Sequence, residues 1–143
     1  MYINLGDWSI RNYVDDDEVA LVKYANNYKI WVNVDDIFPY PYTKNDAKNW
    51  IESTKQLPQT NFAIASPKEA IGGIGLKLKA NIYKGSAEVG YWLGEPYWGQ
   101  GHCYQSSRYP RRICVYQLRF GKAFSDCFRM EPSFCTRSSE KRV

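Results

Sequence analysis

The spacing of apolar residues predicts an N-terminal strand followed by a helix. Trp8 to Val14 is rich in β-branched and aromatic residues and is typical of a strand. The run Asp15-Asp16-Asp17 then supplies capping oxygens and negative charge for a helix N-terminus. The apolar residues that follow at helical spacing form an inward-facing stripe: Leu21, Tyr24, Ala25 and Tyr28. Asn26 and Asn27 mark the end of this helix.

The next segment predicts one or two further helices around a proline-rich loop. Lys29 to Asp36 is ambiguous and fits either a loop or a second short helix. The two prolines in Phe38-Pro39-Tyr40-Pro41-Tyr42 exclude a helix interior there. Thr43 can cap a following helix, with Asp46 three residues on in an imperfect capping box. Ala47, Trp50 and Ile51 form the buried stripe of that helix.

After Pro58 the pattern changes from helical to alternating. Residues 61–65 are a short strand and residues 66–69 a turn. The apolar residues Ile74, Leu76 and Leu78 then alternate with Gly75, Lys77 and Lys79. After a turn at residues 83–86, Ala87 to Leu93 is a more apolar strand, which we expect to be central. One strand, two or three helices and three consecutive strands predict an α+β (mixed α/β) fold with an antiparallel meander.

Composition fits one domain but changes abruptly near residue 101. The chain has 143 residues, 44% hydrophobic and 24% charged, as expected for a soluble globular protein. No apolar run reaches membrane-spanning length and the first residues do not show the pattern of a signal peptide, so a cytoplasmic location is the expectation. Residues 1–101 hold ten Lys and Arg against twelve Asp and Glu, whereas residues 102–143 hold nine against three. All four cysteines lie in the second part.

The segment from Ala87 to Gly101 carries the most specific chemical signal. A strand runs into a loop with glycines at positions 99 and 101. Glycines allow close backbone approach, so successive N–H groups can converge on an anion, and a following helix N-terminus would strengthen the site. A Gly-x-Gly pattern alone is ordinarily a tight turn.

The context of this loop resembles a known family. Ala87 to Gly101 is similar to the fourth strand and pyrophosphate loop of the GNAT superfamily, in its RimJ/RimL-like branch. The family loop is Gln/Arg-x-x-Gly-x-Gly/Ala, often met in that branch as Trp-Gly-x-Gly; Trp98 takes the first position, Gly101 the fourth, and Cys103 stands where Gly or Ala belongs. Further segments in the same order also resemble that branch: Trp8 to Arg11, Lys23 to Asn27, Phe38 to Tyr42, and Ile71 to Leu76. The motif resemblance ends at Gly101.

This resemblance implies transfer of acetyl from acetyl-CoA, the cosubstrate, to a primary amine. Backbone groups around Tyr91, Trp92 and Leu93 would bind the pantetheine arm and polarise the thioester carbonyl. Trp98, Gly99, Gln100 and Gly101 would form the pyrophosphate loop. The acceptor is left open: a protein N-terminus or a small molecule, including an antibiotic, an amino acid or a polyamine, would each fit. The oligomeric state is also left open.

Two sets of residues are candidates for the acceptor side of the reaction. Glu88 is the candidate general base, because a carboxylate beside aromatic surface can have a raised pKa; the alternative is exposure to solvent or pairing with Lys77 or Lys79. Glu95 is expected to be a solvated loop residue. The aromatic loop, Phe38 to Tyr42, could line the amine site together with Trp31 nearby; the candidate residues are Trp31, Phe38, Tyr40 and Tyr42. The alternative is a packed aromatic cluster.

Two rival functions are disfavoured. His102, Cys103, Cys114, Cys127 and Cys135 include no Cys-x-x-Cys pair, so no metal site is expected. Arginines interleaved with Tyr109, Tyr116 and Phe120 superficially suit nucleic acid, but no motif of such a module is present. A non-catalytic, truncated or pseudogene product is a further alternative.

The change at Gly101 favours a shifted reading frame over a divergent natural tail. We therefore divide the chain into residues 1–101, most of the acetyltransferase domain, and residues 102–143, an atypical basic tail expected to be poorly ordered. Starting one nucleotide into the His102 codon, permitted codons can read Ile-Ala-Thr-Lys-Ala-Val-Val-Ile-Leu-Val-Glu-Tyr-Ala-Phe. That restores the small residue of the loop and supplies a proline-free helix. In the present chain, Pro110 disfavours a helix after Gly101, so weak or absent acetyl transfer is expected from it.

Overall fold

The computed structural model describes residues 1–34, 36–78, 80 and 87–99. Within them the chain forms, in order, β1 (Tyr2–Asn4), β2 (Ser9–Arg11), α1 (Asp17–Ala25), α2 (Tyr28–Trp31), α3 (Lys44–Thr54), β3 (Asn61–Ala65), β4 (Ala70–Leu78), β5 (Ala87–Leu93) and the 3-10 turn η2 (Glu95–Tyr97). The order confirms the predicted α+β fold and the three consecutive strands after the helices. The expectations for residues 83–86 and 102–143 lie outside the described residues.

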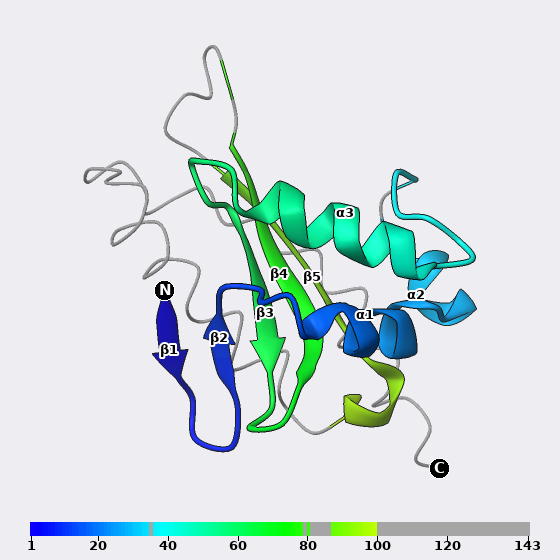
Figure 1. The fold of residues 1–143 in the computed structure, drawn as a ribbon, viewed down its shortest axis with the longest axis horizontal. Coiled ribbons are helices and arrows are strands. Elements are labelled where there is room, and N and C mark those ends of the chain that lie inside the picture. The colour runs from blue at the N-terminus through cyan, green and yellow to red at the C-terminus, as the bar shows by residue number, and fades with distance from the viewer. Residues whose placement is uncertain (35, 79, 81–86, 100–143) are drawn as a thin grey trace.

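The five strands form one antiparallel sheet in the order in which they occur in the chain, β1-β2-β3-β4-β5 (Figure 1). β1 is an addition to the predicted fold; it pairs with β2 through a turn at Gly6, whose φ of +91° favours glycine. The expected central position of residues 87–93 is wrong for the described part of the chain, because β5 pairs there with β4 alone.

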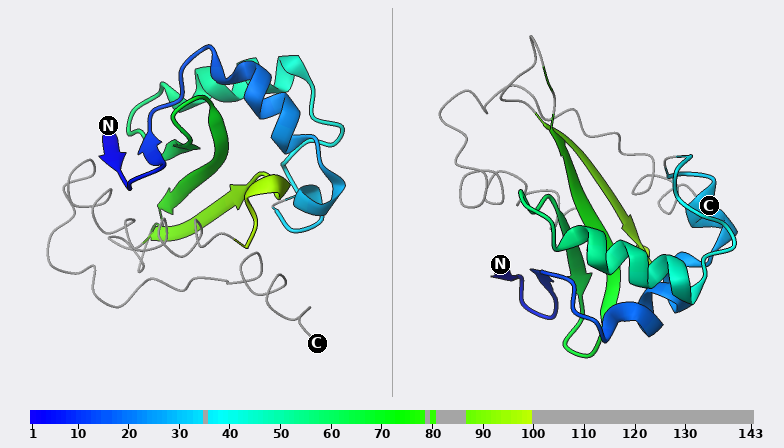
Figure 2. Two further views of the ribbon diagram at one scale, coloured as in Figure 1. Left: turned by 90° about the horizontal axis from the view of Figure 1, so that it is seen from below. Right: turned by 45° about the horizontal axis from the view of Figure 1, so that its top comes forward.

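The helices lie together on one face of the sheet (Figures 1 and 2). α1 begins at Asp17, but Asp16, its N-cap residue, makes no side-chain capping bond. The expected cap is replaced by Asp17, whose carboxylate accepts from the Val14 N–H at 2.9 Å and from both terminal nitrogens of Arg11 at 2.7 Å. The acidic run therefore anchors the helix start to β2.

The N-termini of the second and third helices differ in detail from the sequence prediction. α1 ends before Tyr28, which instead opens α2 and is 58% exposed, so its expected place in the inward stripe is wrong. A short second helix is present, but it spans Tyr28–Trp31, whereas the expected segment was residues 29–36. In α3 the Thr43 hydroxyl accepts from the Asp46 N–H, and the Asp46 carboxylate accepts from the Thr43 N–H, which completes the predicted capping box.

The core lies between the helices and the sheet and uses small residues for close packing. Seven large side chains are the most deeply buried: Phe62, Ile10, Leu21, Ile30, Ile64, Ile71 and Leu93. On β4, a Cβ at Gly73 would lie 2.5 Å from the Tyr13 hydroxyl and 2.8 Å from Trp92 Nε1. Glycine at this position therefore lets the Trp92 indole lie against the sheet.

Candidate functional site

The outer edge of β5 is the first part of the candidate site. The β4–β5 register sets Gly90 opposite Gly75, Tyr91 opposite Ile74 and Trp92 opposite Gly73. In such a ladder, alternate residues direct their N–H and C=O groups away from the paired strand. Among the described residues no second strand pairs with β5. Its outer edge can therefore present backbone donors and acceptors to an extended ligand such as a chain of amides.

The side chains of the predicted cofactor-binding strand residues are largely occupied in packing. Trp92 and Leu93 are buried, and Tyr91 is partly buried against the core. Gly90, by contrast, is exposed, and a Cβ built there would meet nothing within 4 Å. The strand would thus contribute to a ligand through its backbone, with open space beside Gly90.

The turn after β5 is the second part of the candidate site. The Trp98 indole Nε1–H donates to the Leu93 carbonyl at 2.7 Å, which folds the turn back onto the end of the strand. Gly99 follows with a φ of +77°, in the left-handed region that favours glycine. Gln100 and Gly101 lie outside the described residues. The described half of the loop fits an anion-binding turn, because a glycine stands where the backbone bends sharply.

The predicted base, Glu88, lies on β5 in the register position opposite Lys77. Lys77 is one of the two lysines, with Lys79, that the alternative interpretation named as partners of Glu88. The structure leaves the role of Glu88 as a prediction.

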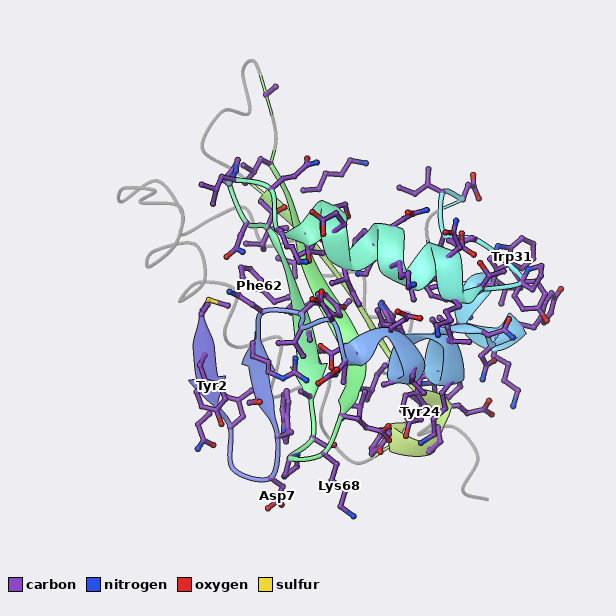
Figure 3. The ribbon with its side chains drawn as sticks, in the orientation of Figure 1. Tyr2, Asp7, Tyr24, Trp31, Phe62 and Lys68 are labelled. Carbon is purple, nitrogen blue, oxygen red and sulfur yellow. The ribbon has the colours of Figure 1, made fainter. Side chains whose placement is uncertain are left out.

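The four predicted acceptor-site aromatics do not form one surface. Phe38 and Tyr42 pack inward: their ring centroids are 5.3 Å apart, and Phe38 lies 6.0 Å from Trp92 on β5. Burial raises the pKa of Tyr42 to about 12. Trp31 and Tyr40 are exposed, with stacked rings 5.5 Å apart, and Figure 3 places Trp31 at the outer end of the helical layer. Tyr28, which the sequence analysis assigned to the core, joins this outer pair.

Several contacts at the turn were not predicted from the sequence. Glu95, expected to be solvated, accepts from Asn27 Nδ2 at 2.7 Å and forms an ion pair with Lys29. The hydrogen bonds from Lys29 and Asn27 lower the pKa of the Glu95 carboxyl. Each partner is more than 60 positions away in the sequence, so no local pattern could have revealed the contact.

A second polar cluster ties α1 to the neighbouring turns. The Tyr24 hydroxyl donates to Glu69 Oε1 at 2.6 Å, and Lys23 Nζ donates to the same oxygen at 2.9 Å. Burial and the bond to Glu69 raise the pKa of Tyr24 to about 12, while the bonds from Tyr24 and Lys23 lower the pKa of Glu69. Tyr24 also lies 3.3 Å, between hydroxyl oxygens, from Tyr97 of η2.

The described residues form neither a metal site nor a membrane-spanning helix. Within residues 1–34, 36–78, 80 and 87–99, no group of three His, Cys, Asp or Glu side chains could hold a metal ion. His102 and the four cysteines lie outside this range. None of the helices described is both long and apolar enough to cross a bilayer.

A sequence profile of the acetyltransferase (GNAT) domain matches residues 9–129 of the chain. The match extends beyond Gly101, where the motif resemblance ends. No curated protein matches the sequence.

Solved acetyltransferase structures share the fold at low sequence identity. A GNAT-family acetyltransferase from Bacillus anthracis is 16% identical with a TM-score of 0.65, and the match covers 84% of this chain and 69% of that one. RimL, a ribosomal L7/L12 α-N-protein acetyltransferase in complex with coenzyme A, is 22% identical with a TM-score of 0.62, over 78% of this chain and 69% of that one. The match covers only 60% and 62% of the length of two further acetyltransferase structures.

Proposed function

Because the chain belongs to the GNAT acetyltransferase family, we propose that β5 and the turn after it bind acetyl-CoA for transfer of the acetyl group to a primary amine. In this proposal the backbone of Tyr91, Trp92 and Leu93 binds the pantetheine arm. The loop Trp98, Gly99, Gln100 and Gly101 binds the pyrophosphate. The observation that carries the proposal is the positive φ of Gly99, in the segment that follows β5 and η2.

The reaction needs a free amine, a polarised thioester carbonyl and a place for one proton. The amine nitrogen attacks the carbonyl carbon, and N–H groups on the outer edge of β5 stabilise the charge that develops on the oxygen. Glu88 is the proposed base that takes the proton from the attacking nitrogen. The carbon–sulfur bond then breaks and coenzyme A leaves as a thiolate.

The acceptor side is proposed to lie along the aromatic loop. Phe38 and Tyr42 support the wall nearest to β5, where Phe38 contacts Trp92. Trp31 and Tyr40 form a separate exposed pair, which would contact the part of the acceptor farther from β5. The resemblance to RimL, which acts on a ribosomal protein, favours a protein N-terminus as the acceptor, and a small-molecule amine is the alternative. A cytoplasmic site of action remains part of this proposal.

A matched pair of glycine substitutions tests coenzyme binding at the loop. Gly99→Ala and Gly6→Ala each place a Cβ on a backbone with positive φ, at a cost of about 1 kcal/mol. A Cβ at Gly6 meets no atom within 4 Å, so this variant serves as a control for backbone strain alone. Thermal unfolding of both variants is followed with coenzyme A and with acetyl-CoA.

The expected result separates strain from binding. Coenzyme A at about ten times its Kd stabilises a protein by about 1.4 kcal/mol, which raises Tm by about 3–5 °C. We expect this rise in the unmodified chain and in Gly6→Ala, and its loss in Gly99→Ala. If neither ligand changes the Tm of the unmodified chain, and the chain shows salt-dependent gel shifts with nucleic acid, the nucleic-acid alternative holds instead.

A further inference from the structure

The turn η2 is attached to the helical layer by contacts from three consecutive parts of the chain. Glu95 accepts from Asn27 at the α1–α2 junction and pairs with Lys29 of α2. Tyr97 contacts Tyr24 of α1, with ring centroids 5.6 Å apart. Figure 3 shows Tyr24 beside this turn at the end of α1.

Gly94 brings the same turn close to α1. A Cβ at Gly94 would lie 2.8 Å from the Tyr24 ring, so glycine allows the backbone to pass directly against that ring. The Gly94 N–H donates to the Ile71 carbonyl at 2.7 Å. Gly94, the residue that leads into η2, therefore lies between Ile71 near the start of β4 and Tyr24 near the C-terminal end of α1.

Asn27 links the Glu95 contact to the start of α2. Its Oδ1 accepts from the Lys29 backbone N–H at 2.9 Å and so caps the helix, while its Nδ2 donates to Glu95 at 2.7 Å. The neighbouring Lys29 side chain reaches the other oxygen of the same carboxylate. One carboxylate thus joins the N-terminus of α2 to the segment that leads to Gly99.

We propose that Glu95 is a positioning residue: it holds η2, the segment that leads to the pyrophosphate loop, against the α1–α2 junction. The loop lies on the coenzyme side of the site, and α2 carries Trp31 of the acceptor side, so Glu95 couples the two sides. The consequence for the coenzyme rests on the proposed function. Both partners of the ion pair are substantially exposed, 37% for Glu95 and 64% for Lys29, so its loss changes the position of the turn far more than global stability.

Amide hydrogen exchange on the full chain tests this role without any ligand. Glu95→Ala removes both contacts, and Glu95→Gln keeps an oxygen for Asn27 while losing the ion pair. Glu52→Gln is the control, because Glu52 of α3 pairs with Lys55, the C-cap residue of that helix, at 3.0 Å and is also exposed. Exchange is measured at Gly94, Tyr97, Trp98 and the α2 amides, with the β3 and β4 amides as the internal reference.

We expect exchange at the turn and at the start of α2 to be about five-fold faster or more in Glu95→Ala, intermediate in Glu95→Gln and unchanged in Glu52→Gln. The β3 and β4 amides should keep their rates in all three. Unchanged rates at the turn in Glu95→Ala would overturn the proposal. Faster exchange throughout the sheet would also overturn it, because Glu95 would then serve general stability.

A coenzyme titration of the same variants extends the test to binding. Glu95→Ala should bind coenzyme A about ten-fold more weakly than the unmodified chain, at an almost unchanged ligand-free Tm. Equal affinities would overturn the coupling to the coenzyme. A failure of the proposed function appears separately, as an unmodified chain without any coenzyme response, and the exchange rates then decide the positioning role.

Discussion

At the scale of single residues, Asp17 makes the most deeply buried ion pair of the described chain. It is 3% exposed, and both of its oxygens accept from Arg11, which is 22% exposed. The pair raises the pKa of Arg11, chiefly through the hydrogen bond to Asp17. Asp17→Asn would leave the Arg11 guanidinium without its counter-charge in a partly buried position. We expect a loss of about 2–4 kcal/mol in the free energy of unfolding, measured by urea denaturation.

Asp15→Asn provides the comparison for this prediction. Asp15 is 83% exposed and pairs with Lys55 at 3.1 Å, so its replacement should cost at most about 0.5 kcal/mol. Equal losses in the two variants would show that the Asp17 carboxylate does not anchor α1.

The proposed base gives a prediction about pH. Glu88→Gln removes the group that would accept a proton and keeps its size, so any acetyl transfer at neutral pH should fall by about 100-fold or more while coenzyme A still raises Tm. The rate of the unmodified chain should decline below the pKa of its base. A pH–rate profile that is the same in both proteins would remove Glu88 from the mechanism.

The residues of the site that the sequence predicted are those with local signals. Gly99 and Trp98 could be proposed as loop residues because a strand, a turn and two glycines follow one another in fifteen residues. Glu95 and Tyr24 were missed as partners of the turn, since each contact joins residues brought together only by the fold. Tyr28 was misplaced because helical spacing continues across Asn26 and Asn27, where the chain actually starts a new helix.

At the scale of elements, the capping box of α3 gives a prediction for one hydroxyl group. Thr43→Ala leaves the Asp46 N–H without its acceptor, so the free energy of unfolding should fall by about 1 kcal/mol. Ser53→Ala is the control, because this hydroxyl donates to the Trp50 carbonyl inside the same helix and caps nothing. Equal effects on urea denaturation would contradict a specific role for the cap.

The elements were predicted best where periodicity extends over many residues. β3, β4, β5 and α3 each follow a clear alternating or helical pattern, and the structure confirms them. β1 was missed because three residues, of which Tyr2 is 66% exposed, carry too little alternation to predict a strand. Within the described sheet β5 lies at the edge, and this position could not be inferred, because an apolar strand can be buried by helices as well as by neighbouring strands.

At the scale of the whole molecule, the nucleotide sequence can show whether the reading frame changes after Gly101. The family profile reaches residue 129, whereas the motif pattern ends at Gly101 with a sudden gain of Cys, Arg and Ser. We predict that removal of one base after codon 101 opens a frame that encodes a small residue and then a proline-free helix. Sequencing codons 99–106 checks this, and a stop codon or a helix-breaking pattern in the shifted frame would exclude the idea.

In the proposed function, coenzyme A binds along the outer edge of β5 and at the turn that follows it. The most direct measurement is a titration of coenzyme A into the isotope-labelled chain, followed by amide chemical shifts. We expect the amide shifts of Tyr91, Trp92, Leu93, Trp98 and Gly99 to change along one binding curve, while those of the β1–β2 hairpin stay fixed. Shifts confined to other parts of the chain, or no shifts at saturating coenzyme A, would contradict it.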